Sequence, residues 1–376
     1  MHKIKLRLHE IYILVCIYIS KALKIFMRKD HWVLVERGSD ARDNAYCLYC
    51  YMKKEHPEKK IYYIIDRKSS DYEKVKEDAV QLGSFRSFLL LASAERLIST
   101  HYGTGLRLAS NRLFRLLRLD DKVCFLQHGI TYNEQRDLFG DSAPMRLFFC
   151  GAKTEYEYIR RVFGHPDSVV KYTGFARFDR LHDARVLNRV LIMPTWRSYI
   201  RNEEEFLKSD YFAHFQSLIS DEKLINALES KGTDLVLYVH YGMQKFIHHF
   251  KSKSALVKIA GFKDYDVQAL LKESALLVTD YSSVFFDFAY MRKPVLYYQF
   301  DFDAFYAGHY LPGEFSYEKD GFGEVCLDKS QLVDAIIAHL NNDMKPEERY
   351  LERMEAYFPL FDNRNCERIY NEIVKN

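Results

Sequence analysis

Two adjacent serines, Ser282 and Ser283, stand where the chain is predicted to pass from a buried strand into a helix. The apolar run 275–278 before them is typical of a short buried strand. A helix that begins with serine offers unpaired backbone N–H groups and hydroxyls, a combination that suits a phosphate. Asp287 follows one helical turn later and could reach hydroxyl groups of the same ligand. The segment therefore predicts a site for a phosphorylated ligand that also carries hydroxyls.

A structural explanation of the same residues is also open. The two serines can act only as helix caps, and Asp287 can simply complement the helix dipole. The helix is expected to end before Pro294, and residues 295–300 form a second strand rich in β-branched and aromatic residues. Such a β-α-β unit makes the two strands parallel, and ligands of parallel sheets bind at the carboxyl ends of strands.

Other polar residues stand at predicted strand ends. They are His128, Gly129 and Arg177 in the first half of the chain, and Pro194, Thr195 and His240 in the second. A single histidine at a strand end is more often a hydrogen-bonded structural residue than a catalyst. The recurrence of such residues at strand ends in both halves indicates a ligand-binding site.

Short strand-like runs alternate with helical stretches after about residue 30. The predicted strands cover residues 32–36, 61–65, 96–99, 123–126, 147–150 and 169–172, then 189–193, 235–239, 256–259, 275–278 and 295–300. Residues 79–91 are expected to form a further strand followed by a helix. This alternation predicts an α/β fold with two Rossmann-like domains facing a cleft, the GT-B architecture. The domains are expected at 29–180 and 181–376, with a hinge near 179–188 and a last helix, 366–374, that crosses back to the first domain.

Composition limits the class of protein. A chain of 376 residues exceeds what one core usually serves, and 48% hydrophobic residues argue against disorder. A net charge of +3 gives no indication of nucleic acid as a partner. Cys47 and Cys50 form an isolated C-x-x-C without further ligands at metal-binding spacing, so we interpret them as helix positions in a reduced, cytoplasmic-facing protein. We predict no metal site, although Mg²⁺ on a diphosphate stays open.

The first 28 residues combine an apolar run, 11–19, with lysines and arginines on both sides. The run is too short to span a bilayer, and no small-residue cleavage site follows it. We interpret residues 1–28 as a basic amphipathic helix on an anionic membrane surface, the alternative being a helix packed on the body of the protein. A second basic stretch, 106–119, has the same pattern and the same alternative.

The sequence of several segments resembles that of the CDP-glycerol glycerophosphotransferases, the family of teichoic-acid polymerases and primases that also occurs in capsule synthesis. In the second half of the chain the segments are DYSSVFFDFA followed by KPVLYY, together with DVQALLKESALLVTD, which leads into the first of them. In the first half they are SDARDNAY, IYYIIDR and AERLIST. Ala275 stands where an acidic residue is more usual. The resemblance covers most of the chain after about residue 30.

The resemblance implies roles for individual residues. The HGTPL-type motif of the family matches His128, Gly129, Ile130, Thr131 and Tyr132, with His128 as the general base and Ile130-Thr131 in place of Thr-Pro. The G-x-x-R-x-D motif matches residues 174–179 and makes Arg177 a phosphate ligand. The P-T-W motif matches 194–196, so Pro194 and Thr195 belong to the site, and the R-x-H motif matches 238–240 with Tyr238 in place of the arginine. Ser282, Ser283 and Asp287 complete the expected donor site, and His240 is expected to assist at the diphosphate.

The implied reaction is transfer of a polyol phosphate from CDP-glycerol or CDP-ribitol to a hydroxyl of a lipid-linked or polymeric acceptor, with release of CMP. The N-terminal domain would bind the acceptor and the C-terminal domain the donor, in a peripheral protein on the cytoplasmic face of the bacterial membrane. Two other functions stay open from the residues alone. One is a GT-B glycosyltransferase that uses a nucleotide sugar, and the other is a non-catalytic membrane-associated scaffold.

Overall fold

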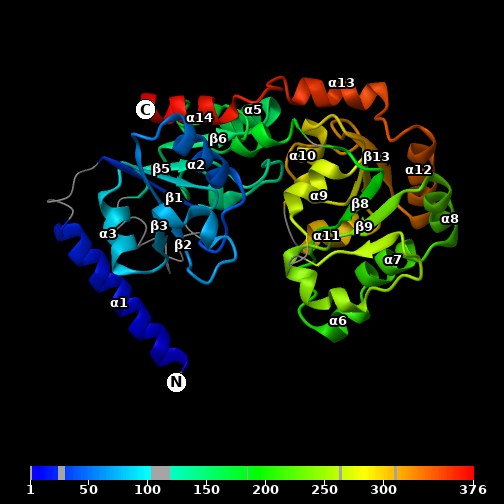
Figure 1. Cartoon of the computed structure of the whole chain (residues 1–376), viewed down its shortest axis with the longest axis horizontal. Helices are drawn as coiled ribbons and strands as arrows, with labels where there is room; N and C mark the ends of the chain where they lie inside the picture. The colour runs from blue at the N-terminus through cyan, green and yellow to red at the C-terminus, as the bar shows by residue number, and fades with distance from the viewer. Residues whose placement is uncertain (1, 24–29, 103–118, 184, 262–264, 309–310) are drawn as a thin grey trace. The chain divides into compact units, whose positions relative to one another are not determined.

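The computed structural model describes residues 2–23, 30–102, 119–183, 185–261, 265–308 and 311–376. The chain forms two compact units, and neither is a continuous stretch. Unit 1 comprises residues 1–130, 136–180 and 362–376, and unit 2 comprises residues 131–135 and 181–361 (Figure 1). The predicted boundary at residue 180 does not describe the passage of residues 131–135 into unit 2. The basic stretch 106–119 lies, except for Leu119, outside the described residues.

Unit 1 is built on a seven-stranded parallel sheet in the order β3-β2-β1-β4-β5-β6-β7. Its strands are β1 (His31–Val35), β2 (Lys60–Ile65), β3 (Ala79–Gln81), β4 (Arg96–Ser99), β5 (Val123–Phe125), β6 (Leu147–Cys150) and β7 (Val170–Tyr172). The register pairs Val35 with Ser99 and Ser99 with Phe125, so β1, β4 and β5 end at the same level. The loops that follow these three strands therefore start side by side.

Both faces of this sheet are buried, which explains why its strands are apolar without a strict polar alternation. Successive residues of β1 point to opposite faces, so Trp32 and Leu34 join one apolar cluster while Val33 and Val35 join the other. The first cluster contains α2 (Asn44–Glu55) and α14 (Asn365–Lys375), and the second contains α1 (His2–Leu23), α3 (Phe85–Ser93) and α5 (Lys153–Val162). The short helices η2 (Tyr72–Asp78), η4 (Arg136–Leu138) and η5 (Ala176–Arg180) lie in loops.

Helix α14 belongs to unit 1 although it follows unit 2 in the sequence. Asp179 accepts hydrogen bonds from the backbone N–H groups of Asn365 and Cys366, both at 2.8 Å. These contacts fix the start of α14 beside η5. Cys47 and Cys50 lie on α2 as predicted, and all seven cysteines of the chain are free.

Unit 2 contains a six-stranded parallel sheet in the order β10-β9-β8-β11-β12-β13. Its strands are β8 (Arg189–Met193), β9 (Asp234–Leu237), β10 (Val257–Ile259), β11 (Leu276–Thr279), β12 (Val295–Tyr298) and β13 (Gly323–Cys326). Its helices are α6 (Glu203–Leu207), α7 (Asp210–Ile219), α8 (Glu222–Lys231), η6 (Tyr241–His249), α9 (Val267–Glu273), α10 (Val284–Tyr290), α11 (Phe302–Gly308), α12 (Lys329–Asn341) and α13 (Glu348–Tyr357). Met193 pairs with Thr279 and Thr279 with Tyr297, so β8 and β11 end together and β12 continues for one residue more.

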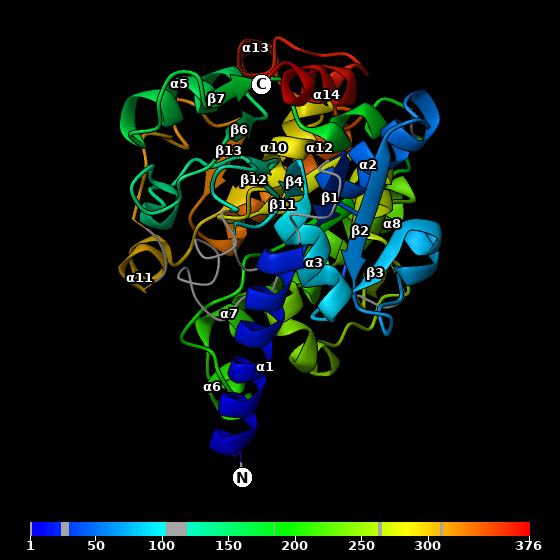
Figure 2. The same ribbon diagram turned by 90° about the vertical axis from the view of Figure 1, so that its left-hand side faces the viewer.

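The two parallel sheets confirm the predicted α/β class. Each predicted strand is present with ends shifted by at most a few residues, whereas β13 was not predicted. Helix α1 packs against α3 (Figure 2). No helix within the described residues is both long enough and apolar enough to cross a membrane.

Candidate active site

The loop after β5 places His128 in an unusual backbone setting. Gln127, the residue before it, has φ = 58°, in the left-handed region that costs a non-glycine residue about 1–3 kcal/mol. Its buried side chain donates two hydrogen bonds, to the carbonyl of Phe149 at 2.7 Å and to Oε1 of Glu155 at 3.0 Å. These bonds hold the strained turn, and the turn carries His128 out of the sheet.

Asn44 ties this loop to two other elements. Its Nδ2 donates to the carbonyls of Gln127 at 2.8 Å and Leu126 at 3.3 Å, and its Oδ1 accepts from the backbone N–H of Arg177 at 3.0 Å. The residue is fully buried, and these contacts use both polar groups of its amide. Asn44 therefore joins α2, the His128 loop and η5 at one point.

The imidazole of His128 stacks on that of His101, which follows β4. The ring centroids are 4.5 Å apart and the planes are inclined by 12°. His101 Nε2 accepts a hydrogen bond from Arg37 Nε at 3.2 Å, and its Nδ1 lies 2.9 Å from Thr100 Oγ1. Because Arg37 can only donate, His101 is neutral and carries its proton on Nδ1. A fixed neutral ring thus supports one face of His128.

This environment also keeps His128 uncharged. Desolvation by the surrounding protein, reinforced by the guanidinium groups of Arg37 and Arg177, lowers the pKa of His128 below its usual 6.5. Part of the side chain remains exposed to solvent. A neutral imidazole with an open edge can accept a proton at neutral pH, as a general base must.

Arg177, predicted to bind phosphate, is buried with 4% of its surface exposed. Its Nη1 donates to Asp43 Oδ1 at 3.1 Å and to the carbonyl oxygen of His128 at 3.3 Å. The structure thus shows Arg177 as a support of the His128 loop. Its contact with a phosphate stays a prediction.

The residues after His128 pass from unit 1 into unit 2. Gly129 is half-buried, whereas Ile130, Thr131 and Tyr132 are buried. Tyr132 donates its hydroxyl to the carbonyl of Tyr281 at 2.5 Å, and its ring packs edge-on against Phe285 and Phe286. Tyr132 therefore holds the backbone just before the two serines. Its contact with substrate stays a prediction.

A buried ion network joins the strand ends of unit 2. Asp280, after β11, accepts hydrogen bonds on Oδ1 from the backbone N–H (2.8 Å) and the hydroxyl (2.7 Å) of Thr195. Arg197 donates Nη2 to Asp280 Oδ2 at 2.9 Å and Nε to Asp301 Oδ2 at 2.7 Å. Arg197 and Asp280 are fully or almost fully buried. The predicted site residue Thr195 is thus engaged by Asp280, and the network fixes the loops after β8, β11 and β12 relative to one another.

The serine pair lies beside this network. Ser282 and Ser283 are partly exposed, and the Ser283 side chain makes no capping hydrogen bond to α10. The capping explanation is therefore wrong for Ser283 and leaves its hydroxyl to another role. Asp287, by contrast, is buried within α10 with 3% of its surface exposed.

His240 follows β9 and is exposed. Its Nδ1 accepts a hydrogen bond from the backbone N–H of Gly242 at 3.2 Å, so it caps η6, and its ring stacks on Trp196 with centroids 6.1 Å apart. Trp196 and Pro194 follow β8, the neighbouring strand. His240, Pro194 and the serine pair therefore belong to the same carboxyl edge of the unit 2 sheet.

Several residues that organise these loops were not predicted: Arg37, Asp43, Asn44, His101, Gln127, Arg197, Asp280 and Asp301. Two of them carried a usable signal. His101 and Asp280 follow predicted strands directly or after one residue, as the predicted site residues do. The buried partners Asn44 and Arg197 show no pattern by which the sequence alone would separate them from ordinary polar residues.

Comparison with known proteins gives the class of the chain. The family model described as CDP-glycerol:poly(glycerophosphate) glycerophosphotransferase matches residues 17–375. The chain belongs to this family.

Individual relatives agree with this membership. The chain is 31% identical over 373 residues to the minor teichoic acid biosynthesis protein GgaB of Bacillus subtilis, covering 93% of this chain and 40% of GgaB. It is 21% identical to the teichoic acid poly(glycerol phosphate) polymerase of the same organism, covering 90% of this chain and 48% of the polymerase. The chain thus spans about half the length, or less, of these relatives.

Solved structures show the fold. The wall teichoic acid polymerase TagF matches with a TM-score of 0.71 at 16% identity, covering the whole of this chain and 95% of that one. A UDP-GlcNAc 2-epimerase from Methanocaldococcus jannaschii matches with a TM-score of 0.54 at 12% identity, covering 92% of this chain and 99% of that one. The fold is therefore that of TagF and of sugar-nucleotide epimerases.

Proposed function

We propose that this chain transfers a polyol phosphate, with glycerol phosphate as the first choice, from a CDP-activated donor to a hydroxyl of a teichoic-acid-like polymer or primer. The observation that carries the proposal is the neutral, partly exposed imidazole of His128 on a strained and fully braced loop, in a chain that belongs to the glycerophosphotransferase family. Family relatives named for glycerol phosphate and for ribitol phosphate both occur, so CDP-ribitol is the second donor to test.

The proposed step is one displacement at phosphorus. The acceptor hydroxyl attacks the phosphorus that carries the glycerol, an O–P bond forms, and the bond to the bridging diphosphate oxygen breaks. CMP leaves with that oxygen, and the hydroxyl proton moves to His128. Phosphoryl transfer depends mainly on positioning and charge stabilisation, and we assign these to the partly exposed serines 282 and 283 and to His240.

The test is incubation of the purified protein with CDP-glycerol and a poly(glycerol phosphate) primer, followed by measurement of CMP. We expect CMP release that depends on the primer, and incorporation of glycerol phosphate into polymer. Parallel reactions contain CDP-ribitol and UDP-sugars. Release of UDP with sugar transfer would replace the proposal by a glycosyltransferase, and no release from any donor would indicate a non-catalytic scaffold.

Substitution of the serine pair should change donor binding without changing thermal stability. Changing both Ser282 and Ser283 to alanine should weaken binding of CDP-glycerol, since a hydrogen bond to a charged phosphate contributes about 1.5–3 kcal/mol. Thermal stability should stay close to that of the wild type because Ser283 caps nothing in the structure. The measurements are isothermal titration calorimetry and Tm.

The matched control is Ser209→Ala. Ser209 caps α7 by accepting a hydrogen bond from the N–H of Phe212, so its loss should cost about 1 kcal/mol of stability and leave donor binding unchanged. If the double variant binds the donor as well as the wild type does, the serines do not contact it.

We further propose that α1 lies on an anionic membrane, on the cytoplasmic face of the cell, with a lipid-linked acceptor nearby. The helix has two apolar faces. Ile13 and Ile17 are buried, whereas Ile11, Val15 and Ile19, spaced four apart, are 46–56% exposed. The lysines and arginines near the run complement anionic headgroups.

Substitutions confined to the exposed apolar face of α1 test this proposal. Ile11→Ser, Val15→Ser and Ile19→Ser together should reduce sedimentation with phosphatidylglycerol vesicles, while the buried face of α1 keeps its contacts. Basic residues near such a surface contribute about 1 kcal/mol each, so wild-type binding should also fall with salt. Binding that responds neither to the substitutions nor to salt would contradict the proposal.

A further inference from the structure

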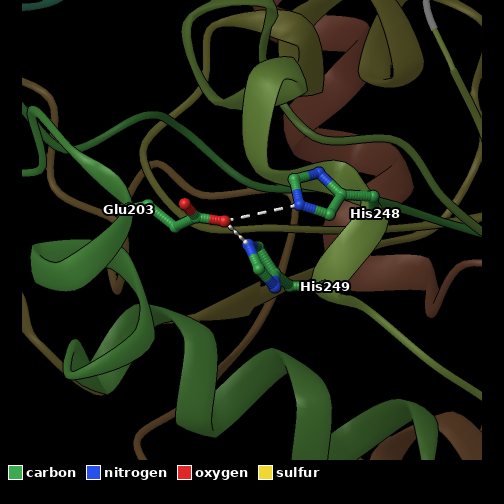
Figure 3. A group of neighbouring side chains, drawn as sticks. All are labelled: Glu203, His248 and His249. Carbon is green, nitrogen blue, oxygen red and sulfur yellow. Dashed lines mark hydrogen bonds and ion pairs between the residues drawn. The ribbon is translucent and has the colours of Figure 1, made fainter.

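Two consecutive histidines and a glutamate converge on the surface of unit 2. His249 Nε2 lies 2.6 Å and His248 Nε2 3.5 Å from the same oxygen of Glu203, Oε1 (Figure 3). Donor atoms of all three side chains lie within 4.8 Å of one another. Glu203 is the first residue of α6, and the histidines end η6, so the cluster joins two elements that are distant in the sequence.

Apolar packing holds the backbones of these two elements together. Phe206 of α6 is fully buried and stacks on Phe246 of η6 with centroids 4.8 Å apart. It also meets Phe250 edge-on, and Lys245 Nζ donates to the carbonyl of Arg201 at 2.9 Å. The three side chains of the cluster therefore start from a preformed scaffold.

The neighbouring glutamates of α6 are paired differently. Glu204 contacts Lys208 at 2.7 Å, and Glu205 accepts from the backbone and guanidinium groups of Arg201. The partners described for Glu203 are both histidines. Two imidazole nitrogens around one carboxylate oxygen form the nitrogen and oxygen donor set that zinc and related cations prefer.

We propose that Glu203, His248 and His249 bind one divalent transition-metal cation of the zinc class. Donor atoms around tetrahedral zinc lie roughly 3.3 Å apart, as follows from Zn–N and Zn–O bonds of about 2.0–2.2 Å. The present 3.5 Å separation matches this value, and the 2.6 Å contact has to open by a rotation of the exposed Glu203 side chain. Water completes the coordination. The assignment of these three ligands does not depend on the proposed reaction.

A cation at this place would clamp η6 at one end. The element is a 3₁₀-helix of nine residues, longer than the three to four residues that are usual for this helix type. Its other end is capped by His240, a residue proposed to act at the diphosphate. The metal thus stabilises the helix that carries His240 at its start.

The test uses protein comprising residues 1–376, purified without a histidine tag and treated with a chelator. Co²⁺ is added as a spectroscopic probe and Zn²⁺ as the calorimetric ligand. We expect visible Co²⁺ bands that Zn²⁺ removes, one Zn²⁺ per chain, and a rise in Tm with Zn²⁺.

Variants assign the ligands. His248→Ala, His249→Ala and Glu203→Gln should each lower affinity at least tenfold and abolish the Tm rise, while circular dichroism in chelator stays native. Glu204→Gln, on the same helix, and His56→Ala, a histidine of unit 1, should bind as the wild type does. Wild-type protein that gives no Co²⁺ bands at micromolar metal, or ligand variants with unchanged affinity, would overturn the proposal.

Discussion

His128→Ala is expected to lower kcat for CMP release by roughly 10²–10⁴-fold, the usual contribution of one positioned base. Donor affinity should change only a few-fold because the imidazole acts on the acceptor hydroxyl and not on the nucleotide. His240→Ala should instead affect both kcat and donor affinity, since His240 would contact the diphosphate in ground and transition states. The measurement is steady-state kinetics together with Tm for each variant.

The pH dependence follows from the lowered pKa of His128. The base works only when neutral, so activity should fall as pH drops through its pKa, and the acidic limb of kcat/KM should lie below pH 6.5. Arg37→Met removes one of the charges that lower this pKa, so the limb should move upward. A purely structural histidine would leave the limb in place.

His56→Ala, whose ring stacks on Tyr370, should keep kcat within about twofold, since His56 lies outside every contact of the His128 loop described above. Near-native turnover in a His128→Ala protein with native Tm would remove His128 as the base. Asp287 would then be the next residue to test, although its burial makes it a poorer candidate.

Arg197→Met is expected to give the largest loss of stability. It leaves Asp280 and Asp301 close together in a buried site without their shared cation, and breaking a buried ion pair by removing one partner costs about 3–5 kcal/mol. Activity should fall as well because the loops after β8 and β11 lose their common anchor. The measurement is urea unfolding of unit 2.

Tryptophan fluorescence can isolate this unit. The chain has two tryptophans, Trp32 in unit 1 and Trp196 in unit 2, so a Trp32→Phe background leaves Trp196 as the reporter of unit 2. Arg201→Met, which removes an exposed i,i+4 pair with Glu205, should leave the unfolding midpoint near that of the parent. An Arg197→Met midpoint equal to that control would show that the network contributes little to stability.

Much of the fold could be predicted because buried parallel strands are continuous apolar runs that end at polar residues. The strand β13 escaped because its four residues, Gly323–Cys326, include a glutamate and only two apolar side chains. The passage of residues 131–135 into unit 2 was not predicted for a different reason. It depends on the Tyr132 hydroxyl reaching Tyr281, a contact across 149 positions that no local pattern encodes.

Of the candidate site, only the residues that follow strand ends could be predicted from the sequence. His128, His240 and the serines stand at strand ends, where parallel topology brings them to the surface of a sheet. The residues that hold them are specified by tertiary contacts. Asn44 is an ordinary helix-start residue in the sequence, yet its amide joins three segments up to 133 positions apart. Gln127 is not a residue type that signals a left-handed turn, and only its buried partners make that conformation stable.

The position of α14 sets an order of events during synthesis on the ribosome. Unit 1 needs Asn365 and Cys366 against Asp179, and the apolar face of α14 against α2, but these residues are translated after all of unit 2. Until residues 181–361 have been translated, the part of this sheet face that α14 covers beside α2 therefore stays exposed. During this interval the nascent chain exposes the apolar surface around Trp32 and Leu48 on which Ile369 later packs. Chaperones bind exposed apolar surface of this kind. A fragment that stops at residue 361 should reproduce this waiting state permanently and recruit chaperones in the cell.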